Sequence, residues 1–184
     1  PKEYRKEFVK TYFAKYNKQK RTFEALTELI QETADDIQYL ESISNALDIA
    51  LNEADLAQIK EELMQSGYIR RKHTKKKVKL TSKPMHYISS DGYDMYVGKN
   101  NLQNEELTFS FANGNDWWFH AKGAPGSHVI VKSGGDELPD RTFEEAGRLA
   151  AYYSKNRGAD KVEIDYIQKK HVKKPNGAKP GFVV

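Results

Sequence analysis

The residue types best able to do chemistry gather in residues 116–128, which run DWWFHAKGAPGSH. This stretch holds both tryptophans and two of the five histidines of the chain. Alternation along a strand puts Trp118 and His120 on one face. Residues 123–126 (GAPG) have the composition of a tight turn, and an apolar strand follows them. The stretch therefore predicts a β-hairpin that gathers four polar side chains at one end, namely His120, Lys122, Ser127 and His128.

Several chemistries can be weighed for this group. A metal site is not expected, because the chain has no cysteine and no HxxxH or HExxH spacing. Ser127 and His128 are neighbours that point to opposite faces of a strand, so His128 is not placed to activate Ser127 as a nucleophile. No carboxylate pair or triad spacing stands out elsewhere, and we expect no enzyme and no cofactor. A polar, partly basic hairpin beside glycine amides instead suits phosphate or RNA.

The two tryptophans leave two interpretations open. Tryptophan in an apolar strand usually packs in the core. The alternative is that Trp117 and Trp118 stack on RNA bases, since aromatic rings are common base-stacking surfaces.

Charge is unevenly distributed along the 184 residues, although the net charge is only +4. Residues 1–68 hold nine Lys or Arg against thirteen Asp or Glu, residues 69–83 hold eight against none, and residues 84–184 hold thirteen of each. The chain therefore divides into an acidic arm, a basic linker and a neutral domain. Unpaired cations in the linker would bind an RNA backbone with a steep dependence on salt. A merely flexible, solubilising linker is the alternative.

Residues 1–68 are predicted to form a helical coiled-coil arm. No proline interrupts residues 2–83, and apolar residues recur at heptad spacing from Phe23 to Leu51. Such a stripe needs a partner helix, supplied by a missing part of the protein or by a second copy in a dimer. A second helix is expected over residues 53–66, capped by Asn52 or Asp55 and stopped by Gly67.

Residues 84–184 are predicted to form an α+β domain with a mainly antiparallel sheet and one or two packed helices. The turn residues 90–92 (SDG) separate two short alternating runs, which indicates a hairpin over residues 85–97. After it, a short helix capped by Asn100 or Asn101 is favoured over a strand through residues 107–111.

The second half of this domain is expected to hold one helix and one more strand. Thr142 and Glu145 have the spacing of a capping box, which would open a helix ended by Gly158. Residues 162–167 alternate as a half-exposed strand.

A further basic stretch, residues 169–181, holds five lysines together with two glycines and two prolines. It lacks the Gly-Lys-Ser/Thr of a phosphate-binding loop, and Pro180 with Gly181 prevents a helix from following, so nucleotide hydrolysis is not expected. Lysines beside glycine amides suit an RNA backbone. A plain surface turn is the alternative.

Three motifs in order resemble the NFACT family: VGKNNLQNEELT at residues 97–108, DWWFHAKGAPGSHVIV at residues 116–131 and HVKKPNGAKPGFV at residues 171–183. Residues 84–184 resemble the R domain of this family, which is an RNA-binding module. Residues 1–68 resemble the end of its middle coiled-coil region.

The resemblance implies a function. Family members bind the large ribosomal subunit with an obstructed nascent chain and recruit tRNA for untemplated tailing, with alanine in bacteria. The chain would be the C-terminal part of such a cytoplasmic ribosome-quality-control factor, contributing rRNA, tRNA and ribosome contacts without tailing activity of its own.

Some family members are described as binding fibronectin or fibrinogen, so a surface adhesin is the alternative, or a second role of the same protein. The sequence shows no signal segment and no apolar run of roughly 18 residues that would span a membrane.

Three groups of residues are predicted to bind RNA on one shared surface. The linker contributes Arg70, Arg71, Lys72, Lys75, Lys76 and Lys77. The hairpin contributes His120, Lys122, Ser127, His128 and Lys132. The C-terminal stretch contributes Lys169, Lys170, Lys173, Lys174 and Lys179.

Overall fold

The structure is a computed structural model that describes residues 2–70 and 81–184. The chain divides into two compact units, residues 1–39 and residues 40–184. The first unit consists of most of helix α1 (Lys2–Ile49), and the second holds the end of α1 together with all other elements. Residues 71–80 of the predicted linker lie outside the described residues.

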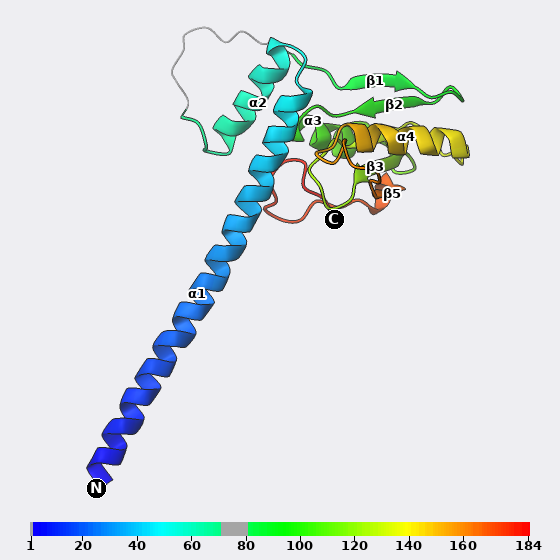
Figure 1. The fold of residues 1–184 in the computed structure, drawn as a ribbon. Helices are drawn as coiled ribbons and strands as arrows, with labels where there is room; N and C mark the ends of the chain where they lie inside the picture. Colours follow the sequence, from blue (N-terminus) through cyan, green and yellow to red (C-terminus); the bar gives the residue numbers. More distant parts are fainter. Residues whose placement is uncertain (1, 71–80) are drawn as a thin grey trace. The chain divides into compact units, whose positions relative to one another are not determined.

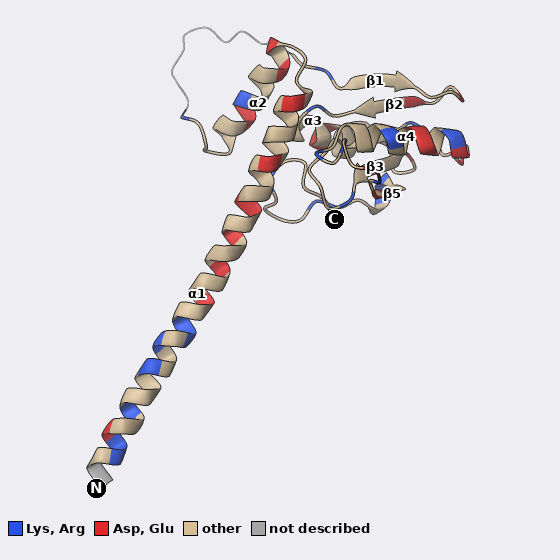
Figure 2. Ribbon diagram, viewed as in Figure 1, with Lys and Arg blue, Asp and Glu red and all other residues tan. Residues whose placement is uncertain are grey.

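Helix α1 confirms the predicted helical arm. Within residues 1–39 its heptad positions Phe23, Leu26 and Ile30 are all exposed. Figure 2 shows its basic residues concentrated toward the N-terminal end and acidic residues following them along the helix. An exposed apolar stripe of this length is the face on which we expect a partner helix.

Helix α2 (Glu53–Gln65) confirms the second predicted helix and its caps. The side chain of Asn52 accepts a hydrogen bond from the backbone N–H of Asp55, which satisfies one free donor at the helix start. Gly67 follows the helix with φ of +81°, a left-handed conformation that glycine adopts without strain.

The second unit contains a five-stranded sheet, so the predicted α+β class with an antiparallel sheet is confirmed (Figure 1). The strand order is β1-β2-β4-β3-β5, and all four neighbouring pairs are antiparallel. The strands are β1 (Met85–Ile88), β2 (Asp94–Val97), β3 (Trp117–Ala121), β4 (Val129–Val131) and β5 (Ile164–Gln168).

One face of the sheet packs against helix α4 (Asp140–Tyr152), which contacts β2, β3, β4 and β5. Fully buried Ala146 and Ala150 let the helix lie close to the strands. The strand residues of this core are Met95, Val97, Phe119, Val129 and Val131. Alternation then sends Trp118 and Ile130 to the other face, where they pack with Leu107 and Val172.

Helix α3 (Asn101–Glu106) confirms the short helix over the strand alternative, with Asn100 as its cap. It continues as a single π-helical turn, η1 (Leu107–Phe111), in which the N–H of Ala112 bonds to the carbonyl of Leu107. Such turns insert one extra residue and often occur at functional sites.

The predicted capping box of α4 is wrong. The helix begins at Asp140 after Pro139, and the Thr142 hydroxyl instead donates to Asp91 Oδ2 at 2.7 Å. Glu145 accepts from the backbone N–H of Ser90 at 2.8 Å. Both side chains therefore tie the start of α4 to the turn between β1 and β2.

The predicted helix stop at Gly158 is also wrong, because α4 ends at Tyr152. The chain there turns back beside the hairpin, and the N–H of Ser127 bonds to the carbonyl of Tyr153.

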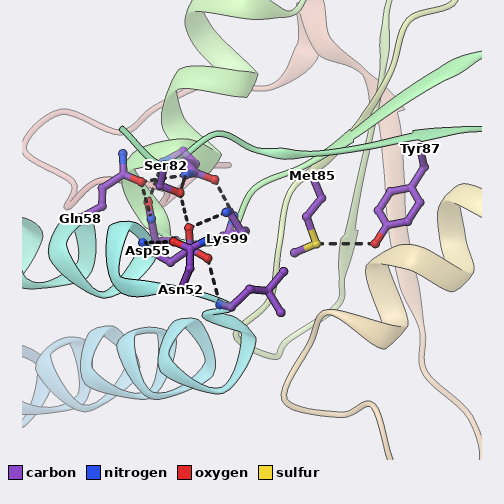
Figure 3. Close-up of polar contacts among 10 residues, drawn as sticks. Asn52, Asp55, Gln58, Ser82, Met85, Tyr87 and Lys99 are labelled. Atoms are coloured by element: carbon purple, nitrogen blue, oxygen red, sulfur yellow. Dashed lines mark hydrogen bonds and ion pairs between the residues drawn. The ribbon is translucent and has the colours of Figure 1, made fainter. Parts of the chain in front are cut away.

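Helix α2 is joined to the sheet domain by a buried ion pair that sequence reasoning did not find (Figure 3). Lys99 Nζ donates to Asp55 Oδ1 at 2.5 Å, and the two side chains are 7% and 0% exposed. Burial opposes the charge on Asp55. Hydrogen bonds from Lys99, Ser82 and the N–H of Leu51 nevertheless outweigh burial and lower the pKa of this carboxyl.

The polar contacts extend along α2. Gln58 Oε1 accepts from Gln103 Nε2 at 2.7 Å and from Asn100 Nδ2 at 2.9 Å. Glu62 accepts from Asn101 Nδ2 at 2.9 Å. Within the NNLQN segment, Asn100, Asn101 and Gln103 therefore contact α2. Asn104 instead contacts the hairpin.

We expect Lys99→Met to destabilise the chain by about 3–5 kcal/mol, because it leaves the carboxylate of Asp55 buried without its counter-ion. Urea unfolding followed by circular dichroism measures the change. Lys155→Met is the matched control, since Lys155 forms its ion pair with Glu41 on the surface and its loss should cost about 1 kcal/mol or less. Equal stability of the two variants would contradict a structural role for the buried pair.

Candidate nucleic-acid interface

The hairpin of β3 and β4 brings its two histidines together, as predicted. The ring of His120 stacks on Trp118 with centroids 5.6 Å apart, and His128 lies 5.4 Å from His120. In the connecting turn Gly123 has φ of +61°. Gly126 has no positive φ, but a Cβ at this position would lie only 3.1 Å from Cβ of Ser154. A larger residue at position 126 would therefore crowd Ser154.

His128 is buried and held in place by its neighbours. Its Nδ1 lies 2.8 Å from the hydroxyl of Thr108, and its backbone N–H donates to Asn104 Oδ1 at 2.9 Å. Burial, and secondarily the neighbouring His120, lowers the pKa of His128 well below its usual range. A neutral, buried imidazole supports the hairpin from inside.

Ser127 is buried as well, and both tryptophans are packed in the domain. Trp118 belongs to the core on the face of β3 opposite α4, whereas Trp117 meets Phe143 edge to face at 5.1 Å. The structural interpretation of the tryptophans is therefore favoured. RNA contact by Ser127 and His128 stays a sequence-based prediction, and their burial favours a supporting role.

The two lysines of the hairpin are separated and each meets a carboxylate. Lys122 Nζ lies 3.4 Å from Glu163 Oε2, and both side chains are exposed. Lys132 Nζ donates to Asp116 Oδ2 at 2.5 Å, and Asp116 is buried. These pairs lie at opposite ends of β3, so the hairpin does not present one cationic tip.

The C-terminal stretch meets Lys132 at the loop of residues 113–116. The backbone N–H of Lys169 bonds to the carbonyl of Asp116 at 2.8 Å, and that of Lys170 bonds to the carbonyl of Gly114 at 2.9 Å. The backbone of Lys169 and Lys170 therefore lies beside this loop, and RNA binding by these lysines and Lys132 stays a sequence-based prediction.

The remaining predicted cations are distributed differently. Lys174 donates to Glu105 at 2.7 Å, and Lys179 Nζ to the hydroxyl of Tyr68 at 3.0 Å. In the part of the chain that the structure describes, Lys169, Lys170 and Lys173 form no ion pair.

Arg70 is exposed. The other predicted linker residues lie outside the described residues; they are Arg71, Lys72, Lys75, Lys76 and Lys77.

Sequence reasoning missed the aromatic partners of these lysines. Lys132 Nζ lies 4.8 Å from the ring centroid of Phe111, and Lys169 Nζ lies 5.8 Å from that of Phe109. Both phenylalanines come from η1, so this turn stands between two cations. The alternation of Phe109 and Phe111 was visible in the sequence, but it was interpreted only as a choice between helix and strand.

Residues 2–70 and 81–184 contain neither a metal cluster nor a membrane-spanning helix. No group of three or more His, Cys, Asp or Glu side chains there is arranged to hold a metal ion. None of the helices in these ranges combines the length and the apolar character that crossing a bilayer requires.

Two family matches cover nearly the whole chain. Residues 5–82 match the family described as NFACT N-terminal and middle domains, and residues 83–183 match the NFACT protein RNA binding domain. The fold and these two matches thus define a class of protein in which a helical arm is joined to an RNA-binding α+β domain. The chain belongs to the NFACT family.

Several relatives extend this finding. The chain is 47% identical over 173 residues to the Rqc2 homolog RqcH of Streptococcus pneumoniae serotype 2 (strain D39), covering 94% of this chain and 31% of that protein. It is 41% identical over 182 residues to RqcH of Bacillus subtilis (strain 168), covering 96% and 31%. The chain therefore spans about a third of the length of these curated relatives.

A solved structure is also similar, the C-terminal part of the fibronectin/fibrinogen-binding protein from Streptococcus suis. The TM-score is 0.86 at 44% identity, and the match covers 95% of this chain and 70% of that one.

We expect the free energy of unfolding to fall as pH decreases below about 6.5, the usual histidine pKa. The unfolded chain binds a proton at His128 in this range and the folded chain does not, so this residue alone removes up to about 1.4 kcal/mol of stability per pH unit. Burial also lowers the pKa of His120, which adds to the slope. Urea titrations at pH 7.5, 6.5 and 5.5 measure this slope. His128→Gln should make this slope shallower, whereas His171→Gln, a change at an exposed residue, should leave it unchanged. Identical slopes in all three proteins would refute the role of His128 in the pH dependence.

Proposed function

We propose that this chain contributes RNA contacts to a ribosome-quality-control factor that acts on the large ribosomal subunit with an obstructed nascent chain. The observation that carries the proposal is the group Lys169, Lys170 and Lys173, which extends from a domain matching the NFACT RNA-binding family. Cations that no carboxylate neutralises are suited to phosphate oxygens and give affinity without reading sequence.

The proposed partners are rRNA and tRNA on the large subunit, in the cytoplasm. Relatives named Rqc2 homolog RqcH support this assignment. The chain acts in this proposal as a binding module and not as an enzyme, because the ribosome performs peptide transfer. Support of untemplated alanine tailing belongs to the whole protein, of which this chain covers the part that resembles the coiled coil and R domain.

The basic end of α1 adds a second contact in this proposal. Residues 2–21 hold eight Lys or Arg against two acids, whereas residues 22–62 hold one lysine against eleven acids. Phosphate is attracted to the first segment and repelled by the second. In this proposal a partner helix packs on the exposed stripe at Phe23, Leu26 and Ile30. That helix comes from the rest of the protein or from a second copy.

A second candidate function is binding of fibronectin or fibrinogen at the cell surface. The similarity to the Streptococcus suis protein of that description favours it. The two functions can be carried by one protein, because basic surfaces also bind acidic glycoproteins.

We expect RNA affinity to fall steeply with salt, and Lys169→Gln, Lys170→Gln and Lys173→Gln together to reduce the slope of log affinity against log salt by about 2–3, roughly one per lost phosphate contact. Fluorescence anisotropy with an rRNA fragment between 50 and 300 mM KCl measures the slope. Arg141→Gln with Arg148→Gln on α4 is the control and should leave it nearly unchanged. An unaltered slope in the triple variant would remove the lysines from the interface.

For the adhesin function, we expect binding of the purified full-length protein to immobilised fibronectin to survive 150 mM NaCl. Antibody labelling of unlysed cells should detect the protein on their surface. If binding is lost at this salt concentration and intact cells stay unlabelled, adhesion is not a function of this protein.

A further inference from the structure

Strand pairing aligns one residue from each strand in a row across the sheet. His86 pairs with Tyr96, Tyr96 with Ile130, Ile130 with Trp118, and Trp118 with Ile167. The middle of the row, Ile130 and Trp118, is buried under Leu107 and Val172.

The β1 end of this row is open. No described strand pairs with the outer side of β1, and the side chain of His86 is 46% exposed. The ring of His86 lies nearly parallel to that of Tyr96, with centroids 4.7 Å apart and an interplanar angle of 18°. Tyr96 covers one face of the His86 ring, and the exposed remainder of His86 at the edge of the sheet is an aromatic surface of the kind on which nucleobases stack.

The π-helical turn η1 extends this surface toward the lysines. Phe111 meets Tyr96 edge to face at 4.7 Å and is 41% exposed. Lys132 Nζ lies over its ring, and Lys169 Nζ lies over Phe109 of the same turn. Aromatic rings therefore alternate with cations from the edge of the sheet to the C-terminal stretch.

We propose that His86 and Phe111, both supported by Tyr96, form a stacking platform for the bases of single-stranded RNA, with the phosphates running toward Lys169 and Lys170. This deepens the proposed RNA-binding function and depends on it. It assigns the site to unpaired nucleotides, because bases inside a duplex do not offer their faces.

The charges around the platform favour phosphates at its lysine end over its His86 end. Asp94 Oδ1 lies 2.6 Å from His86 Nε2, which orients the ring and places a negative charge at the outer edge. A phosphate is disfavoured there, whereas a base is not. At the other end Lys169 and Lys170 form no ion pair with any described residue and attract phosphate.

The test compares single-stranded and double-stranded RNA on the complete chain. Fluorescence anisotropy with a labelled 12-nucleotide oligo(A) at fixed salt should show about tenfold weaker binding for His86→Ala and for Phe111→Leu, in the range typical of losing one stacked base. The salt slope should be unchanged, since no cation is removed. A 12-base-pair RNA duplex should bind all of these proteins equally.

Tyr152→Leu is the matched control. Tyr152 is 63% exposed on α4, the helix that covers the opposite face of the sheet, and its loss should leave oligo(A) binding unchanged. Thermal unfolding shows whether each variant is folded. If Phe111→Leu is unfolded, the test depends on the surface variant His86→Ala.

A second measurement uses the unaltered chain. Oligonucleotides containing 5-iodouridine should crosslink on irradiation to residues 85–111, located by mass spectrometry. Salt-sensitive RNA binding with no effect of either variant, or crosslinks confined to other segments, would overturn the platform and leave the proposed function standing. Absence of RNA binding by the unaltered chain would overturn both.

Discussion

One buried ion pair, Asp55 with Lys99, holds helix α2 on the sheet domain. A buried charge is stable only where charge and hydrogen-bond partners compensate for the lost water, so displacing α2 from Lys99 is costly. The pair fixes α2 against the chain that leads into α3 and η1. An apolar contact in the same place would hold the parts together but would define their register less sharply.

The chain after Lys99 continues into α3 and the π-helical turn, whereas other contacts place the C-terminal stretch. Helix α3 begins directly after Lys99, and η1 continues it across the sheet face opposite α4. The carbonyls of Gly114 and Asp116 then fix the backbone of Lys170 and Lys169. A cationic stretch that looks flexible in sequence is thereby held in a defined position beside aromatic rings. A surface of this kind combines electrostatic attraction, which acts at a distance, with ring stacking, which acts only on contact.

Local signals in the sequence are sufficient to predict most helices and strands of this chain. Period-two alternation and the SDG and GAPG turns predicted the hairpins, and Asn52, Asn100 and Gly67 predicted helix ends, because each acts within a few residues. Thr142 does not cap α4 because its hydroxyl bonds to Asp91, which is distant in sequence.

The candidate site could not be predicted for the same reason. The pairing of His86 with Tyr96, and the contact of Lys132 with Phe111, can be recognised only once the strand order is known. Charge counting also gave Lys132 and Lys174 as available cations, although Asp116 and Glu105 neutralise them.

The π-helical turn between Leu107 and Phe111 has an evolutionary consequence. It differs from an ordinary helical turn by a single residue, which is what one codon inserted into an ancestral α-helix produces. Restoring the α-helix would rotate every later side chain by about 100° about the axis, carrying Phe111 away from Lys132 while Leu107 stayed anchored. A one-codon change in this turn would therefore move an aromatic contact surface and, through Ala112, part of the core that it covers.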